Sequence, residues 1–209
     1  MSLVDKLKWR YATKKFDNTQ KIASEKLDYI LEATQLAPSS LGLQPYRILV
    51  VEDAAIREQL KEASHGQTQI TDASQLIVFA VENNLNEEFG KKYIDNVAAI
   101  RNVPRESLAG FEGMVLGTIN GRSKEELKTW SQKQAYIALG VLIAAASEQS
   151  VDICPMEGFD VARYNDILNL TEKGLTATVI ATVGYRASDD AYAQLAKVRR
   201  AKEELFIHV

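Results

Sequence analysis

The stretch AYIALGVLIAAA, residues 135–146, is the most apolar segment of this 209-residue chain. It is shorter than the roughly 20 residues that a helix needs to cross a bilayer. Upstream, Ser123 and Glu126 have the spacing of a capping box, which predicts one long helix from there to about Gln149. Because this helix is apolar nearly all round in its second half, it must be covered on every side. The stretch therefore predicts either the centre of the fold or a subunit interface.

Three short apolar runs predict strands. RILVV at residues 47–51 and QLIVFAV at residues 75–81 are too continuous in apolar character to have one solvated face, so we expect two central strands. TATVIATV at residues 176–183 predicts a third strand. Asp53 is placed to cap a helix between the first two strands, through about Ala63.

Further helices follow from caps and apolar spacing. Ser2 and Asp5 predict a short capped helix to about Arg10, and its apolar residues are expected to face the core. The other expected elements are a helix capped by Ser24 and ending before Pro38, a strand end at residues 151–154, and a helix from Asp160 to about Leu168. The apolar residues expected to face the core are Leu3, Leu7 and Trp9 in the first helix, and Leu27, Ile30 and Leu31 in the second.

Residues 86–120 differ from their surroundings, because they are richer in Asn, Gly and charge. They predict a helix at residues 88–101 and a weaker one at residues 107–114, which together suggest an insertion or lid. The sequence contains no internal repeat and no linker, so residues 1–209 are expected to form a single domain. Interleaved strands and long helices indicate an α+β or α/β class with a mixed sheet.

Composition excludes several classes of protein. With 46% hydrophobic and 25% charged residues, the chain is an ordinary globular one, and disorder is set aside. A formal net charge of −3 argues against a dedicated binder of nucleic acid or of anionic membranes. One cysteine, Cys154, allows no intramolecular disulfide, and with two histidines it predicts no metal site. The N-terminus lacks the apolar core of a signal peptide, so we expect a cytoplasmic protein.

Motif searches exclude the commonest catalytic signatures. The sequence has no G-x-G-x-x-G after a strand, no G-x-x-x-x-G-K-[ST], no G-x-S-x-G and no H-E-x-x-H. His65 and His208 are isolated, and neither is assigned a role.

Four separated clusters are more informative. In residues 10–16, RYATKKF, cations at a helix end could bind a phosphate or an electron-rich ring, or simply complement the helix dipole. Residues 37–45 form a hydroxyl-bearing loop between prolines, which could also be only a rigid turn. Residues 155–160, PMEGFD, form a glycine turn that could present free N–H groups, although such glycines are often steric. Residues 197–200, KVRR, are basic and could be a solvated face.

In this order and at these separations, the clusters resemble the FMN-dependent nitroreductase family, over nearly the whole chain. The family's Arg-x-Ser-x-[Arg/Lys]-x-Phe is matched by residues 10–16, except that Ala12 replaces the serine and removes one side-chain hydrogen bond to the cofactor. The other matches are Pro-Ser-Ser through Gln-Pro-Tyr at residues 38–46, Trp130 with Gln134, Pro-x-Glu-Gly-Phe at residues 155–159, and Lys-x-Arg at residues 197–199.

The resemblance implies an α+β fold: a three-layer α/β/α arrangement with a mixed, largely antiparallel sheet. It implies a homodimer with FMN sites shared between subunits, and no nucleic-acid or membrane partner. The implied enzyme is an NAD(P)H-dependent FMN oxidoreductase. It would pass a hydride from NADH or NADPH through the flavin N5 to a nitroaromatic or quinone by a ping-pong mechanism. Other flavin chemistry (dehalogenation, dehydrogenation or flavin breakdown) and a non-catalytic flavin-binding protein stay open, as does a plain interaction module.

The resemblance also implies site residues. Arg10 and Lys14, with Lys197 and Arg199, would bind the FMN phosphate and the pyrimidine edge of the flavin. Backbone N–H groups of Glu157 and Gly158 would face N5, and no side chain would be catalytic. Pro38, Ser39 and Ser40 would come from the partner subunit. The remaining expected cofactor contacts are Tyr11, Ala12, Gly42, Gln67, Gln69, Gln134, Pro155 and Met156, and the expected substrate wall is Tyr93, Phe111 and Met114.

Overall fold

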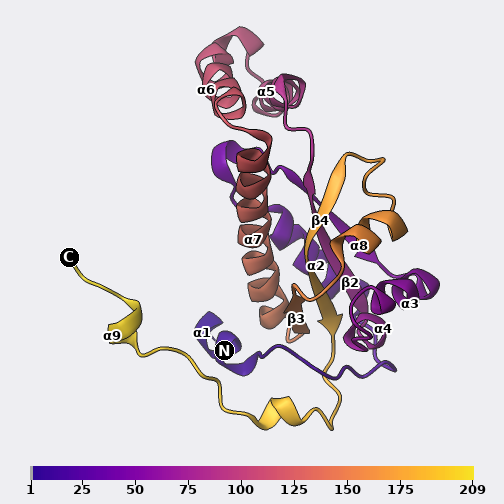
Figure 1. Ribbon diagram of the computed structural model, residues 1–209. Coiled ribbons are helices and arrows are strands. Elements are labelled where there is room, and N and C mark those ends of the chain that lie inside the picture. The colour runs from indigo at the N-terminus through magenta and orange to yellow at the C-terminus, as the bar shows by residue number, and fades with distance from the viewer. Residues whose placement is uncertain (1) are drawn as a thin grey trace.

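The computed structural model describes residues 2–209 (Figure 1). Its strands are β1 (Tyr46–Val51), β2 (Gln75–Glu82), β3 (Asp152–Met156) and β4 (Leu175–Gly184). Its α-helices are α1 (Leu3–Trp9), α2 (Ser24–Gln35), α3 (Ala54–Glu62), α4 (Gln69–Asp72), α5 (Glu87–Arg101), α6 (Ala109–Asn120), α7 (Lys124–Glu148), α8 (Val161–Ile167) and α9 (Lys202–Leu205). Short 3₁₀ turns occupy Ser40–Gly42, Arg105–Leu108 and Ala191–Gln194.

The four strands form one sheet in the order β1-β2-β4-β3, and all three strand pairs are antiparallel. The expectation of a mixed sheet is therefore corrected: in the described part of the chain, the only parallel pairing is a single bridge between Ala12 and Ile153. The expectation of two central strands is also wrong for β1, which lies at the edge. Its side chains show why, since Arg47 and Val50 are exposed, whereas β2 is buried along nearly its whole length.

Helices cover both faces of the sheet (Figure 1). On one face, α2 and α7 pack on alternate residues of β2 and β4, among them Phe79 and Val179. On the other face, α3, α4 and α8 pack on the remaining residues, among them Val78 and Ile180. This arrangement confirms the α+β class in three layers. The cap predicted at Asp53 is confirmed, because its carboxylate accepts a hydrogen bond from the backbone N–H of Ile56 at 2.8 Å.

The long helix α7 is confirmed, including its capping box of Ser123 and Glu126. The expectation that the helix is covered on every side is not met within one chain, because Tyr136 and Ile137 are 41% and 44% exposed. The core-facing expectation for α1 is wrong in the same way, because the helix buries no residue and Leu3 is 54% exposed. The cap predicted at Ser24 is also wrong: α2 begins at that residue and has no side-chain cap.

The segment between β2 and α7 folds as two helices, α5 and α6, which pack against each other near the start of α7 (Figure 1). We call residues 86–120 the excursion. It shares a small apolar core with the main body, made of Ile94, Val115 and Ile119 from the excursion and of Leu43 and Leu127 from outside it. The weaker helix expected at residues 107–114 is longer, because the chain remains helical to Asn120.

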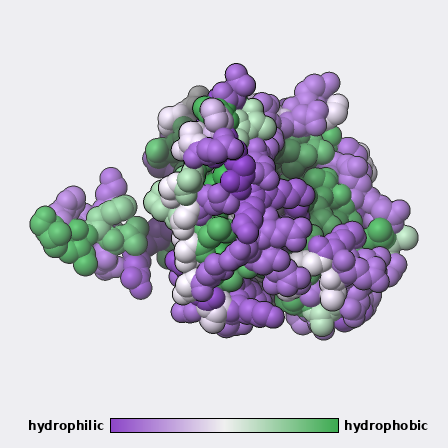
Figure 2. All heavy atoms as spheres, turned by 90° about the horizontal axis from the view of Figure 1, so that it is seen from above, coloured by the Kyte–Doolittle hydropathy of each residue, from purple (hydrophilic) through white to green (hydrophobic). Residues whose placement is uncertain are grey.

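After β4, residues 185–190 lie against residues 10–17, and the chain then continues as an extended tail, residues 193–209, which contains α9 (Figure 1). Viewed from above, the apolar end of this tail stands apart from the rest of the molecule (Figure 2). Among residues 2–209, no helix combines the length and apolar character needed to span a bilayer.

Candidate functional site

The two basic segments found in the sequence lie together in the structure. The ammonium of Lys197 donates hydrogen bonds to the backbone oxygens of Leu7 and Arg10, so the start of the tail lies along the end of α1. Burial lowers the pKa of Arg10, and the charge of Arg199 lowers it further. Burial also lowers the pKa of Lys197, with the charges of Arg10 and Arg199 acting in the same direction.

We call Arg10, Lys14, Lys197 and Arg199 the cationic cluster. Between residues 2 and 209, none of the four forms an ion pair with a carboxylate. The Nε of Arg10 is buried and has no hydrogen-bond partner. Arg10, Lys197 and Arg199 are close enough for their positive charges to repel one another, and a buried donor without a partner is costly. The cluster is therefore suited to an anionic ligand that accepts hydrogen bonds.

Asp190 holds the first basic segment in place. Its carboxylate accepts hydrogen bonds from the backbone N–H groups of Lys14 and Lys15, at 2.9 and 3.1 Å, and from the Tyr11 hydroxyl at 2.8 Å. Burial by itself would raise the pKa of Asp190, but these hydrogen bonds bring it below its usual value. The side chain is 5% exposed, so Asp190 is a buried anchor under the site.

Arg186 adds a second anchor on the same side. Its guanidinium lies between the rings of Trp9 and Tyr11, 4.4 and 4.6 Å from their centroids, and pairs with the Asp152 carboxylate. Together with the bridge between Ala12 and Ile153, these contacts fix residues 10–16 against β3 and the segment after β4.

The glycine turn follows directly from β3. Pro155 and Met156 end the strand, while Glu157 and Gly158 are exposed. Among the described residues, the N–H groups of Glu157 and Gly158 have no hydrogen-bond acceptor. The Tyr136 hydroxyl of α7 donates to the Glu157 carboxylate. Burial, and to a smaller extent this contact, raises the pKa of Tyr136 to about 12. The turn thus presents two backbone N–H groups that no acceptor within residues 2–209 occupies.

Residues 66–69 lie beside this turn. The Gln67 amide donates to the backbone oxygens of Ser64 and Gly158, at 3.0 and 2.9 Å. Gln69 is instead buried at the first position of α4. Gln67 therefore fixes the Gly158 carbonyl, which is a link that the sequence did not reveal.

The loop at residues 39–44 is joined to α7. The backbone N–H of Ser40 donates to Oε1 of Gln134 at 2.8 Å, and the Gln134 amide nitrogen donates to the Trp130 carbonyl at 3.0 Å. Ser39 accepts a hydrogen bond from the Gln44 backbone at 3.0 Å. Of the other residues expected here to contact the cofactor, Pro38 and Gly42 are exposed. Through its bond to Ser40, Gln134 supports the loop directly, independently of any contact with a cofactor.

The expected substrate residues come from the excursion. Tyr93 and Phe111 form an edge-to-face pair with ring centroids 6.1 Å apart, and Met114 is 59% exposed. The Tyr93 hydroxyl donates to the Leu41 carbonyl at 2.8 Å, so this side chain reaches the loop at residues 39–44.

The site residues fall into two separate groups within one chain. Residues 10–16, the turn at Glu157 and Gly158, and the start of the tail form one group, whereas the loop at residues 39–44, Gln134 and Tyr93 form the other. Across residues 2–209, no hydrogen bond or ion pair joins the loop at residues 39–44 to the cationic cluster. A single chain leaves the two groups apart, which is compatible with sites that two chains share.

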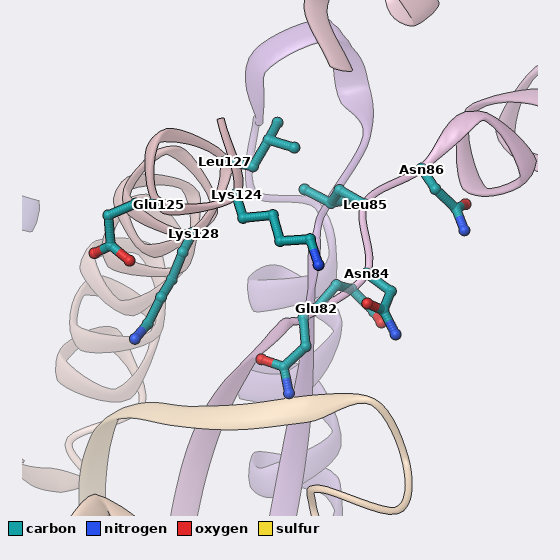
Figure 3. A pocket seen from close by; sticks show the side chains of 9 residues that line it. Glu82, Asn84, Leu85, Asn86, Lys124, Glu125, Leu127 and Lys128 are labelled. Atoms are coloured by element: carbon teal, nitrogen blue, oxygen red, sulfur yellow. The ribbon is translucent and has the colours of Figure 1, made fainter. Parts of the chain in front are cut away.

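Two hollows accompany these groups. A groove of about 670 Å³ follows the outer edge of β1 and continues between α2 and α5, with Gly42, Gln44 and Tyr93 in its lining. A smaller pocket of about 240 Å³ lies where the excursion joins the body, between the end of β2 and the start of α7. Figure 3 shows the Lys124 side chain extending there toward the segment that carries Glu82 and Asn84. None of the site residues expected from the sequence lines this smaller pocket.

Comparison with known proteins identifies the family of this chain. The family model for the nitroreductase family matches residues 7–185. A Staphylococcus saprophyticus protein named "Putative NAD(P)H nitroreductase" is 31% identical, and the alignment covers 98% of this chain and 95% of that protein. A Bacillus subtilis protein of the same description is 32% identical, with 90% of each chain covered.

Solved structures show the same fold. A protein from Exiguobacterium sibiricum, described as a "putative nitroreductase in complex with FMN", superimposes with a TM-score of 0.86 at 18% identity, covering 100% of this chain and 98% of that one. A Staphylococcus epidermidis protein described as a "putative NAD(P)H:FMN oxidoreductase" gives a TM-score of 0.87 at 22% identity, covering 100% of this chain and 96% of that one. The chain belongs to the nitroreductase family, which confirms the resemblance noted in its sequence.

Proposed function

We propose that this protein is an NAD(P)H-dependent FMN oxidoreductase of the nitroreductase or quinone reductase type. The observation that carries the proposal is the cationic cluster with its unpartnered Arg10 Nε, on segments adjoining the free N–H groups of Glu157 and Gly158. Membership of the nitroreductase family and the names of the relatives support the same class.

The residues present fit FMN. Its phosphate and the pyrimidine edge of its ring are acceptor-rich, and the phosphate is anionic, so both match a group of cations that form no ion pair within residues 2–209. We assign these contacts to Arg10, Lys14, Lys197 and Arg199. When bound, FMN supplies hydride chemistry at N5, taking two electrons from NADH or NADPH and giving them in a second half-reaction to a nitroaromatic or quinone.

The protein's own part is binding and electrostatics. Positive charge near the pyrimidine edge favours the negative charge that a reduced flavin carries. The N–H groups of Glu157 and Gly158 are free to donate to the ring, and Gln67 and Tyr136 hold that turn from both sides. No side-chain acid or base is required, which agrees with a sequence that lacks the common catalytic signatures.

We further propose that the enzyme is a homodimer whose sites combine the two separated groups. Apolar side chains that a lone chain leaves in water support this proposal, because a second copy could cover them. They come from α1, α7 and the tail: Leu3, Val4, Leu7, Tyr136, Ile137, Leu205, Phe206, Ile207 and Val209.

The tail and the groove along β1 are complementary. β1 is an edge strand, so one side of its backbone is free to pair with an extended segment. The end of the tail has the sequence LFIHV at residues 205–209 and is exposed at every position. We therefore assign the groove beside β1 to the tail of a second copy, beyond the point where Lys197 holds the tail to its own chain.

We propose that residues 1–209 form one nitroreductase-like domain and that the excursion forms its substrate side. The small apolar core that joins the excursion to Leu43 and Leu127 of the main body supports a single domain. Tyr93, Phe111 and Met114 stay the proposed substrate wall.

The proposal is tested by the absorbance of the purified protein. We expect a yellow protein with the spectrum of FMN and close to one flavin per chain after reconstitution. A colourless protein that FMN does not saturate would contradict it and would favour a plain interaction module. A yellow protein that NADH and NADPH leave oxidised would instead favour a flavin-binding protein without turnover.

A further inference from the structure

The loop at residues 39–44 has a strained backbone. Leu41, Gly42 and Gln44 have positive φ angles of 57°, 73° and 41°. Only glycine adopts such angles readily, so Leu41 and Gln44 must be held there by their surroundings. Strain of this kind gathers at functional segments, and this loop is the one that carries Ser39 and Ser40.

Some of the contacts that hold the loop are internal. The backbone N–H of Gly42 donates to the Ser39 carbonyl at 2.9 Å, and that of Leu43 donates to the Ser40 carbonyl at 3.3 Å. These bonds close the turn, but they leave its placement on the protein to contacts from outside.

Three outside contacts come from three different helices. The Gln44 amide donates to the Gln35 carbonyl of α2 at 2.8 Å, and Gln134 of α7 accepts from the Ser40 N–H. The third is the Tyr93 hydroxyl of α5, which donates to the Leu41 carbonyl at 2.8 Å. Among these contacts, Tyr93 alone comes from the excursion, and it acts on a strained residue.

Gly42 is fitted to the Tyr93 hydroxyl. A Cβ atom built on Gly42 would lie 2.4 Å from the Tyr93 Oη, a distance that real Cβ atoms essentially never show. The same Cβ would lie 3.5 Å from the Tyr93 Cζ, which is ordinary contact. The hydroxyl therefore occupies the space that a side chain at position 42 would need.

We propose that Tyr93 is a positioning residue, whose hydroxyl holds the loop at residues 39–44 in the conformation that the flavin site requires. The effect on flavin binding rests on the proposed function. The contact between Tyr93 and the loop is seen in the structure and does not depend on it.

The test uses Tyr93→Phe in the full-length protein, since this variant keeps the ring that packs on Phe111 and removes only the hydroxyl. The matched control is Tyr29→Phe. The Tyr29 hydroxyl also makes one hydrogen bond, to Glu148 at 2.9 Å, and this bond does not involve the loop at residues 39–44. Amide hydrogen exchange of Gly42 and Leu43 is measured in the flavin-free protein, and FMN affinity by quenching of flavin fluorescence.

We expect Tyr93→Phe to speed exchange at both amides and to weaken FMN binding, each by about fivefold, as one lost hydrogen bond predicts. Tyr29→Phe should do neither. Exchange rates in Tyr93→Phe equal to those of the wild type would overturn the inference. The inference would also be overturned if the wild type binds FMN and Tyr93→Phe shows faster exchange but the same FMN affinity as the wild type.

A double-mutant cycle with Gly42→Ala adds a readout that a general loss of stability would not move. Gly42→Ala should weaken FMN binding less in the Tyr93→Phe background than in the wild type. Without the Tyr93 hydroxyl, the new Cβ no longer meets an atom at 2.4 Å, and its contact with Cζ at 3.5 Å is an ordinary one. Additive effects would overturn the inference. If the wild type binds no FMN, the proposed function fails. The exchange measurement then still decides whether Tyr93 holds the loop.

Discussion

The backbone N–H of Ser40 donates to Oε1 of Gln134 at 2.8 Å, joining the loop at residues 39–44 to the middle of α7 across 94 positions of sequence. Gln134 is 5% exposed, and its amide nitrogen is occupied by the Trp130 carbonyl. A residue that the resemblance placed at the cofactor is therefore also a support of the loop that would reach the cofactor of a second chain.

Gln134→Leu should loosen this loop. Loss of the acceptor leaves the Ser40 N–H without its partner, so we expect the free energy of unfolding to fall by about 1 kcal/mol and FMN affinity to fall about fivefold. Lys133→Ala, an exposed change on the same helix, is the control and should alter neither quantity. Urea unfolding and FMN titration measure them. Wild-type affinity in Gln134→Leu would show that the link has no part in flavin binding.

Arg199→Ala should separate binding from stability. We expect FMN affinity to fall about tenfold, because a charged hydrogen-bonding group is lost. The flavin-free protein should be no less stable, since one of three mutually repelling cations has been removed. Lys14→Ala should weaken binding as well, and Arg200→Ala, on a neighbouring exposed residue, should not. If Arg199→Ala and Lys14→Ala both retained FMN as well as the wild type does, the assignment of the cationic cluster would be contradicted.

Asp190 should make the first basic segment sensitive to acid. Its pKa is lower in the folded protein than its usual value of about 3.9, so its contribution to stability is complete above that value. The contribution is lost as pH falls through the lowered pKa. Asp190→Asn should therefore cost about 1–3 kcal/mol at pH 7, and the difference from the wild type should shrink below about pH 4. Urea unfolding between pH 3 and pH 7 measures this.

The neighbouring carboxylate provides the control for that experiment. Asp189 is exposed, and its one ion pair within residues 2–209 is with the exposed Lys15, so Asp189→Asn should change stability by less than about 0.5 kcal/mol. A cost for Asp190→Asn that does not vary with pH would mean that its charge is not what anchors residues 10–16.

Removal of the end of the tail should break the dimer and spare the cationic cluster. A chain ending at Arg200 keeps Lys197 and Arg199 but loses residues 201–209, the part assigned to the groove beside β1. We expect light scattering to give a dimer for the full chain and a monomer for the shortened one at micromolar concentration. A shortened chain that is still a tight dimer would move the interface to α1 and α7 alone.

Much of the fold could be predicted because its signals are local. Capping residues and apolar runs lie within a few positions of one another, so α7, α3 and the strand β4 could be located from the sequence. The position of β1 at the sheet edge could not, because strand order depends on pairings that no local pattern encodes. The prediction that α1 faces the core was wrong for a related reason: an amphipathic pattern shows that a helix has an apolar face, but not what that face contacts.

The site divides in the same way. Residues 10–16 and 197–199 are visible as basic segments, and the structure brings them together. Asp190 could not be found, and the contacts of Gln67 and Tyr93 could not be predicted, because each acts on a residue that is distant in sequence: 176 positions separate Asp190 from Lys14, and 91 separate Gln67 from Gly158. A carboxylate, an amide and a phenol are common on any surface. Only their contacts distinguish them.

The most direct measurement is anaerobic mixing of the FMN-loaded protein with NADH or NADPH, followed by the flavin absorbance. We expect one of the two nicotinamides to bleach the flavin within seconds, and a quinone or nitroaromatic added afterwards to restore the oxidised spectrum in a separate step. A flavin that stays oxidised with both nicotinamides would contradict the proposed oxidoreductase, whatever the protein binds.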